Sequence, residues 1–209
     1  TRQRPTQEMR REAMKERLYE ATLQVIIDEG WHQASTQKIA ARAGVSRGAQ
    51  THHFQSKTDL LLAAIRNNVR RYQAAIDEQA EALLAGEGAL RTYLDLLWDG
   101  SQEAGFLQSW VEALVAARTD SELRGQVVET DRVAIDSMRD FGRRASQQSG
   151  NADLGADLVE MTAYLLRGME IQRGAHGEQA RMHHLFERWV RIAEVVMGLD
   201  AAELDAAGP

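Results

Sequence analysis

The residues whose types and spacing point most clearly to chemistry form a short segment in the first quarter of the chain. Ser35 can cap the first turn of a helix, and Ala40 is small enough to face a neighbouring helix. Gly44 comes four residues later, where a sharp turn needs a left-handed backbone. Val45 supplies an apolar anchor, and Ser46 supplies a second cap. This order favours a helix-turn-helix, although an ordinary helical hairpin would use the same residues.

A helix-turn-helix reads DNA by laying its second helix in the major groove. Arg47, near the start of that helix, can donate two hydrogen bonds to guanine, or contact the DNA backbone or solvent instead. Gln50 can pair with adenine through two hydrogen bonds. Gly48 and Ala49 lack bulk and allow a close approach, and Ala49 can also touch a thymine methyl group. These four residues are therefore the candidates for base recognition.

Other polar residues of this region suit contacts with the phosphate backbone. Thr36 and Gln37 stand at the start of a helix, where free N–H groups attract phosphate, and Lys57 stands at the start of a later helix. Arg10 and Arg11 come before the first apolar stripe and either touch the backbone or form a solvated face. Three further candidates contact bases or phosphates, the last of them facing phosphate or packing beneath the domain: Thr51, His52 and His53.

Helices must position these residues, because the composition leaves little room for strands. The two prolines are Pro5 and Pro209, and the interior is rich in the helix formers Ala, Leu, Glu, Arg and Gln. Apolar residues recur at helical spacing, with Gly, Ser and Thr at the ends of the periodic stretches. The pattern predicts an all-α protein with helices over 9–29, 35 or 36 to 43, 46–53, 56–84, 88–99, 103–117, 120–148, 153–173 and 178–198.

Charge is distributed unevenly along the 209 residues. The formal net charge is −6. Residues 1–60 hold ten Lys and Arg against seven Asp and Glu, a net charge of +3, so residues 61–209 carry −9. A basic N-terminal part and an acidic remainder indicate that only the N-terminal part contacts a polyanion. A positive excess of three charges also arises by chance.

Several classes of function find no support in the sequence. The chain has no cysteine, which excludes disulfides, thiolate metal sites and a cysteine nucleophile. It has no phosphate loop, nucleophile motif or HExxH zinc pattern, and the adjacent pairs His52-His53 and His183-His184 point apart on a helix. We therefore expect neither an enzyme nor a metal or cofactor, and an interaction bundle is the other rival. No apolar run approaches the ~20 residues of a membrane span, and no signal peptide is visible, so we expect a cytoplasmic protein without membrane contact.

The N-terminal segment resembles the DNA-binding domain of TetR-type bacterial transcriptional regulators. The resemblance covers about residues 10–65 and rests on Gly30, Ser35, Ile39-Ala40, Ala43-Gly44-Val45-Ser46-Arg47-Gly48-Ala49, His53-Phe54, Ser56-Lys57 and Leu60-Leu61. It implies three DNA-binding helices, a helical regulatory domain and a homodimer on a near-palindromic operator. It also implies a repressor released by a small ligand, with an activator or a repressor without a ligand as alternatives.

Two residues depart from the pattern of that family. Gln50 and Thr51 stand where its members often have Leu and Tyr. We therefore expect Gln50 to face solvent or DNA instead of the core. The Tyr of the family commonly packs against or touches the DNA backbone, and we expect Thr51 to make at most part of this contact. The operator preference of other members does not carry over to this chain.

The helix pattern and the resemblance together divide the chain into three parts. We expect a helix-turn-helix domain over 1–55, a helical ligand-sensing and dimerisation domain over 56–200, and a frayed tail over 201–209. The helix over 56–84 joins the first two parts without a flexible linker. A ligand that tilts this helix would change the separation of two recognition helices in a dimer and so weaken DNA binding.

Two sets of residues on the later helices are candidates for binding a ligand and a second subunit. Aromatic and flexible apolar residues suit an apolar or aromatic effector, although each also suits the core: Tyr72, Tyr93, Leu97, Trp98, Phe106, Trp110, Met138 and Phe141. Arg139, Arg143 and Arg144 pair with an acidic ligand or form a solvated face. The last two helices carry stripes for a four-helix dimer interface, unless they pack on their own subunit: Leu158, Met161, Leu165, Met169, Leu185, Trp189, Ile192 and Val196.

Overall fold

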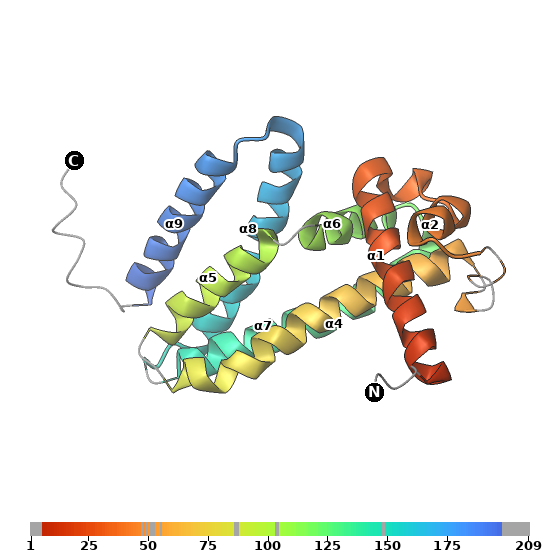
Figure 1. Ribbon diagram of the computed structural model, residues 1–209. Coiled ribbons are helices and arrows are strands. Elements are labelled where there is room, and N and C mark those ends of the chain that lie inside the picture. Colours follow the sequence, from red (N-terminus) through yellow and green to blue (C-terminus); the bar gives the residue numbers. More distant parts are fainter. Residues whose placement is uncertain are drawn as a thin grey trace. The chain divides into compact units, whose positions relative to one another are not determined.

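Every element that the computed structural model describes is an α-helix, and the described residues are 6–46, 48, 50, 53–54, 56–85, 88–102, 105–147 and 149–197 (Figure 1). The helices are α1 (Gln7–Gln33), α2 (Thr36–Ala43), α4 (Lys57–Leu84), α5 (Ala89–Gln102), α6 (Phe106–Ala116), α7 (Ser121–Ala145), α8 (Ala152–His176) and α9 (Gln179–Val196). Their bounds lie within a few residues of the predicted ones, and the all-α class is confirmed. The tail over 201–209 lies outside the described residues.

The chain forms two compact units, and their division does not follow the boundary expected at residue 55. Unit 1 contains Thr1–Arg71 and Ala104–Thr130, and unit 2 contains Tyr72–Glu103 and Asp131–Pro209. Both α4 and α7 contribute one part to each unit. Unit 1 therefore includes α6 and the first turns of α7 in addition to the N-terminal helices.

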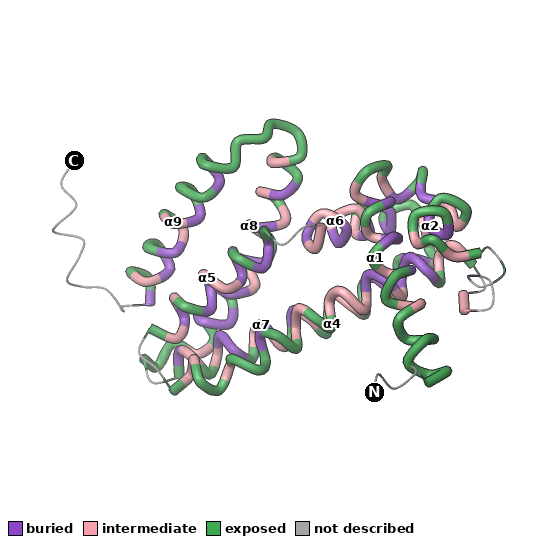
Figure 2. Tube along the Cα trace, viewed as in Figure 1, coloured by how far each residue is buried: buried purple, intermediate pink, exposed green. Residues whose placement is uncertain are grey.

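One hydrophobic core holds unit 1 together. Its members come from α1, α2, α4, α6 and α7, and Figure 2 shows the stretches of these helices that are buried. Each large apolar side chain withdrawn from water stabilises the fold by about 1.5–3 kcal/mol. The core includes Leu18, Val25, Ile26, Ile39, Leu60, Leu61, Ile65, Trp110, Ala113, Leu123 and Val127.

Helix α6 is fastened to the last turns of α1 by hydrogen bonds as well as by the core. The helical path of α1 breaks at Gly30, whose φ of 79° lies in the region that favours glycine. The backbone N–H of Trp31, freed by this break, donates to Glu112 Oε2 at 3.3 Å. Gln108 Nε2 donates to the carbonyl oxygen of Ile27 at 3.2 Å. These bonds satisfy backbone groups that the end of α1 leaves without helical partners.

The turn after α2 has the geometry that the sequence predicts. Ser35 Oγ accepts a hydrogen bond from the Lys38 N–H at 3.3 Å and so caps α2. Gly44 adopts φ 63° and ψ 35°, a left-handed conformation that is costly for residues with a Cβ. The N–H of Val45 then donates to the carbonyl oxygen of Ala40 at 3.1 Å and satisfies the end of the helix.

Reciprocal hydrogen bonds fix the start of α4. Ser56 Oγ accepts from the Asp59 N–H at 3.0 Å, and Asp59 Oδ2 accepts from the Ser56 N–H at 3.1 Å. This is a capping box with Asp at its third helical position. Ser56 therefore caps α4, at the start of the helix predicted over 56–84.

In unit 2, α5 packs against α8 and α9, and its aromatic side chains stack on those of other helices. Tyr93 of α5 stacks on Phe141 of α7, with ring centroids 3.8 Å apart and an interplanar angle of 14°. Trp98 of α5 stacks on Phe186 of α9 at 4.8 Å. Stacked aromatic pairs contribute about 0.5–1.5 kcal/mol beyond the area that they bury. They therefore fix the faces that α5 turns toward its neighbours.

Helices α7 and α8 approach closely because glycines meet between them. A Cβ on Gly155 would lie 2.5 Å from the carbonyl oxygen of Gly142 and would also overlap Ser146 Oγ. Arg167 of α8 pairs with Asp131 of α7 at 2.5 Å, away from this crossing. The backbones can therefore touch only as long as both glycine positions carry no side chain.

We predict that Gly44→Ala destabilises the protein by about 1 kcal/mol or more, because an L-residue is strained at the φ of Gly44. Gly48→Ala is the matched control, because a Cβ meets no atom within 4 Å at either glycine and Gly48 does not have a left-handed backbone. We expect this control to be neutral or slightly stabilising. Urea unfolding followed by circular dichroism measures both, and equal losses would contradict the assigned turn.

We predict that Gly155→Ala lowers the free energy of unfolding by about 1–3 kcal/mol, because the added methyl group overlaps backbone that cannot move easily. Gly174→Ala on the same helix is the control, because its Cβ would meet no atom within 4 Å. The control should keep or slightly raise stability, since alanine is the better helix former. Thermal unfolding compares the two, and an undiminished Gly155→Ala stability would mean that α7 and α8 are not in close contact.

Candidate nucleic-acid interface

The segment after the Gly44 turn, which we call the recognition segment (residues 45–54), is helical at Gly48, Gln50 and His53. The Gln50 N–H donates to the Ser46 carbonyl oxygen at 3.1 Å, and the Phe54 N–H donates to the Gln50 carbonyl oxygen at 3.0 Å. Phe54 packs against the core of unit 1, with its ring centroid 5.9 Å from that of Tyr19. A capped helix, a left-handed glycine and a second anchored helix therefore follow one another, as a helix-turn-helix requires.

Four of the predicted DNA contacts fall outside the described residues, and their roles stay predictions: Arg47, Ala49, Thr51 and His52. Gly48 is described and exposed, and an added Cβ there would stand in open space. The absence of a side chain at Gly48 leaves room for the helix to approach a DNA groove closely.

Gln50 is placed differently from what the sequence led us to expect. Its side chain is only 1% exposed, so it faces the interior of unit 1 and not solvent. Its Oε1 has no hydrogen-bond partner among the described residues. Gln50 was expected to face solvent or DNA because it replaces a residue that is usually apolar in the family, but its position packs inward in this chain. Reading of adenine by Gln50 has no support from this placement.

The first turn of α2 presents the predicted phosphate contacts. Thr36 is half-buried and Gln37 is exposed, directly after the Ser35 cap. The first N–H groups of a helix have no partners within it, and the helix dipole adds partial positive charge there. The N-terminus of α2 can therefore hold a phosphate, with the Gln37 side chain beside it.

Two lysines lie next to this helix start. Lys57 Nζ donates to the carbonyl oxygen of His32 at 3.1 Å, and Lys38 Nζ donates to that of Gln33 at 3.2 Å while pairing with Glu29. Partial burial, together with the charge of Lys38, lowers the pKa of Lys57. An anion bound here would raise the pKa of Lys57 again, because an opposite charge favours the ammonium form. The sequence singled out Lys57 but missed Lys38, whose only signal was a basic residue in the first turn after a cap.

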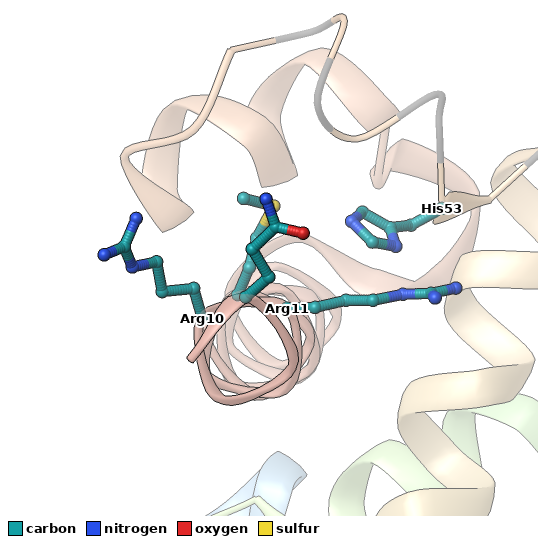
Figure 3. Close-up of a pocket in the computed structure, with 5 residues that line it drawn as sticks. Arg10, Arg11 and His53 are labelled. Atoms are coloured by element: carbon teal, nitrogen blue, oxygen red, sulfur yellow. The ribbon is translucent and has the colours of Figure 1, made fainter. Parts of the chain in front are cut away.

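A second basic region lies at the other end of the domain, where the first turns of α1 pass the end of the recognition segment. Gln7, Arg10, Arg11 and Met14 line an open cleft with His53 (Figure 3). Arg10 and Arg11 extend to opposite sides of α1, and the His53 ring lies on the side of Arg11. His53 thus lies near Arg11, and its contact with phosphate stays a prediction.

The predicted effector residues are divided between the two units. Phe106 and Trp110 belong to unit 1, and Trp110 is buried in its core. The Tyr72 hydroxyl donates to the carbonyl oxygens of Leu96 and Leu97 in unit 2. The rest of the set also lies in unit 2 and is buried there: Tyr93, Leu97, Trp98, Met138 and Phe141.

Tyr93 differs from the other aromatic residues of unit 2 in one respect. Its hydroxyl is buried without a hydrogen-bond partner among the described residues, and burial raises the pKa of Tyr93 far above its usual range. A neutral phenol can still donate one hydrogen bond. Among the described residues of the predicted effector set, Tyr93 therefore has a buried hydroxyl that can still donate a hydrogen bond to a ligand.

The arginines considered for an acidic ligand already have carboxylate partners. Arg139 pairs with Asp157 at 2.9 Å and also with Glu160, and Arg144 pairs with Glu81 at 2.7 Å. Arg143 lies 3.7 Å from a carboxylate oxygen of Asp153. These residues serve contacts between helices, and an acidic ligand would have to displace those partners.

The predicted interface residues of α8 and α9 fall on two different faces. Leu158 is buried within its own chain, so its assignment to the dimer interface is wrong for this structure. Leu165, Met169 and Trp189 are half-buried, and Trp189 Nε1 donates to Thr162 Oγ1 at 2.8 Å. The others are exposed by 42–53%: Met161, Leu185, Ile192 and Val196.

Neither a metal centre nor a membrane span stands out in the part of the chain that the structure describes. No three His, Cys, Asp or Glu side chains gather there as a metal ion would need. No described helix combines the length and apolar character required to cross a bilayer.

Comparison with known sequences agrees with the helix-turn-helix geometry. Residues 18–64 match the family described as bacterial regulatory proteins, tetR family. The chain is 37% identical over 122 residues to an HTH-type transcriptional regulator of Mycobacterium tuberculosis that is itself uncharacterised. That alignment covers 57% of this chain and only 60% of the relative's length. A second relative, the HTH-type transcriptional regulator BetI of Yersinia pestis, is 29% identical over 78% of this chain and 82% of its own.

Solved structures show the same fold at low sequence identity. A Mesorhizobium loti protein assigned to the TetR-family transcriptional regulators matches with a TM-score of 0.72 and 17% identity, over 90% of this chain and 98% of its own. A Saccharomonospora viridis protein assigned as a transcriptional regulator, in complex with choline, matches with a TM-score of 0.67 and 19% identity, over 88% and 96%. These relatives are regulators and not enzymes, as the sequence led us to expect. Residues 18–64 of the chain are therefore similar to the tetR family of bacterial regulatory proteins, and the structural neighbours share its fold.

Proposed function

We propose that this protein is a homodimeric repressor that binds a palindromic operator through unit 1 and is released by a small effector bound in unit 2. The observation that carries the DNA-binding part is the sequence of Ser35 cap, left-handed Gly44 and anchored recognition segment. This arrangement holds a helix at an angle that fits the major groove. The lysines beside the N-terminus of α2 supply the phosphate contacts that fix its register.

The dimer interface is the exposed apolar face of α8 and α9. Met161, Leu185, Ile192 and Val196 are large apolar residues that remain 42–53% exposed, although the opposite face of each helix is buried within the subunit. Apolar residues that gather on one surface usually mark an interface. Two such helices from each subunit form a four-helix bundle, and a two-fold dimer matches two half-sites of a palindrome.

The effector is a small molecule with an apolar or aromatic part. Support comes from the aromatic groups buried in unit 2 and from the choline bound to the similar Saccharomonospora viridis protein. The Tyr93 hydroxyl, buried without a partner, is suited to a hydrogen-bond acceptor on the effector. Because α4 and α7 belong to both units, a ligand that favours one arrangement of unit 2 can bias DNA binding by linkage.

A DNA-binding assay separates base recognition from phosphate contact. We expect Arg47→Ala to lower the preference for a protein-selected duplex over mixed-sequence duplex by about 5- to 150-fold, because it removes about 1–3 kcal/mol of contact with a base. Lys57→Ala should weaken binding to both duplexes equally, because phosphates carry no sequence information. Fluorescence anisotropy measures the affinities of the wild type and both variants for the two duplexes. A wild-type protein that binds no duplex at low salt would end the DNA-binding proposal.

A charge placed on the exposed face of α8 and α9 tests the dimer. We expect Ile192→Glu to give a species of half the wild-type mass, because an unpaired carboxylate in an apolar interface is strongly destabilising. Val128→Glu is the matched control, since Val128 of α7 is 56% exposed and lies outside that face. Light scattering after size-exclusion chromatography gives the masses. Unchanged mass for Ile192→Glu, or dissociation by both variants, would place the interface elsewhere.

A further inference from the structure

Two adjacent carboxylates near the end of α1 pair with two cations of α2. Helices α1 and α2 pack side by side in unit 1 (Figure 1). Glu29 pairs with Lys38 in the first turn of α2, and Asp28 pairs with Arg42 in its last turn. The two cations stand four residues apart and therefore lie on one face of α2. All four side chains are 32–47% exposed, so water and dissolved ions reach both pairs.

The pair of Glu29 and Lys38 lies beside the proposed phosphate contacts. Lys38 Nζ also donates to the carbonyl oxygen of Gln33, and Lys57 Nζ donates to that of the preceding residue, His32. Partial burial lowers the pKa of Lys57, and the positive charge of Lys38 lowers it further, so the two ammonium groups repel each other. Glu29 therefore places a carboxylate on the side of unit 1 where we propose that phosphates bind.

A carboxylate and a phosphate compete for the same ammonium group. Both are oxyanions that accept charge-assisted hydrogen bonds from a lysine. Because Lys38 is already paired with Glu29, a phosphate must displace this carboxylate or share the ammonium group with it. The carboxylate also repels the phosphates around it. Attraction to phosphates supplies most of the affinity for DNA of any sequence, so a carboxylate at this place weakens binding to every duplex.

We propose that Glu29 is an internal substitute for phosphate, which occupies Lys38 in the free protein and so weakens the binding of unit 1 to DNA of any sequence. The proposal rests on the DNA-binding function proposed above and assigns a regulatory contact to the same surface. Electrostatic attraction alone then holds the protein less firmly on mixed-sequence DNA. Residence on DNA consequently depends more on the contacts that the recognition segment makes with bases.

The neighbouring ion pair provides a matched control. Asp28→Asn removes the same charge as Glu29→Gln from the next position of α1, and it also releases a cation of α2. The cation that it releases, Arg42, stands in the last turn of α2, one turn farther than Lys38 from the start of the helix. Any difference between the two variants therefore comes from the position of the released cation and not from the net charge.

The affinity for DNA and its salt dependence test the proposal. Fluorescence anisotropy would follow the full chain on a mixed-sequence duplex of about 30 base pairs, between about 50 and 200 mM salt. We expect Glu29→Gln to bind about 2- to 30-fold more tightly at the lowest salt, because one exposed ion pair in each subunit of a dimer no longer has to be broken. The slope of log affinity against log salt should steepen by up to about 0.9 for each subunit, because the released ammonium group neutralises one more phosphate.

Two further variants decide whether Lys38 is the cation that Glu29 withholds. Glu29→Gln/Lys38→Gln should lose the gain in affinity, because the released ammonium group is gone. Asp28→Asn should gain less than Glu29→Gln. An unchanged or weaker affinity of Glu29→Gln, a double variant that keeps the gain, or an equal gain in Asp28→Asn would overturn the proposal while DNA binding by the wild type stands. A wild type that binds no duplex at low salt would overturn the DNA-binding function as well.

Thermal unfolding separates this regulatory contact from a purely structural one. If the pair served only to fasten α2 to α1, Glu29→Gln would lower the melting temperature and weaken binding to DNA. That pair of results would contradict the proposal. We expect tighter binding at a melting temperature close to that of the wild type, because an exposed ion pair contributes little to stability.

Discussion

The core of unit 1 is the constraint on which the DNA-binding geometry depends. Leu18 and Ile26 of α1, Ile39 of α2 and Leu60 of α4 bury their side chains together with Trp110 of α6. This packing sets the direction of α2, and the Gly44 turn then sets that of the recognition segment. The polar contacts on the surface add little free energy by comparison, because exposed ion pairs contribute about 0–1 kcal/mol. The surface groups set the specificity of binding, whereas the core holds the helices in the geometry that binding requires.

The same core ties α6 to the DNA-binding helices, and this changes where the chain can respond to a ligand. The Trp31 N–H bonded to Glu112 and the Gln108 side chain bonded to the Ile27 carbonyl hold α6 to the end of α1. A helix that the sequence assigned to ligand sensing is therefore part of unit 1. An effector bound in unit 2, as we propose, would act on unit 1 through α4 and α7, because these helices belong to both units.

Features set by neighbouring residues could be predicted from the sequence, and features set by distant partners could not. Gly44 and the caps at Ser35 and Ser56 follow from local backbone chemistry, and the structure has each of them. Gln50 was expected to face outward because it is polar, but the helix register turns its position toward the core. Trp110 and Leu158 lie on amphipathic helices, and periodicity gives the apolar face of a helix without naming the partner that covers it. His53 is far in sequence from Arg10 and Arg11, so only the fold brings it to the cleft that they line.

We propose that two copies of unit 1 read a symmetric duplex. Selection of duplexes from a random-sequence pool with the purified protein, followed by sequencing and by the mass of the selected complex, tests it most directly. We predict enrichment of an inverted repeat whose half-sites lie about one or more helical turns apart, with an even number of chains on each duplex. A pool with no enriched sequence, or an enriched sequence without two-fold symmetry bound by a single chain, would contradict the account.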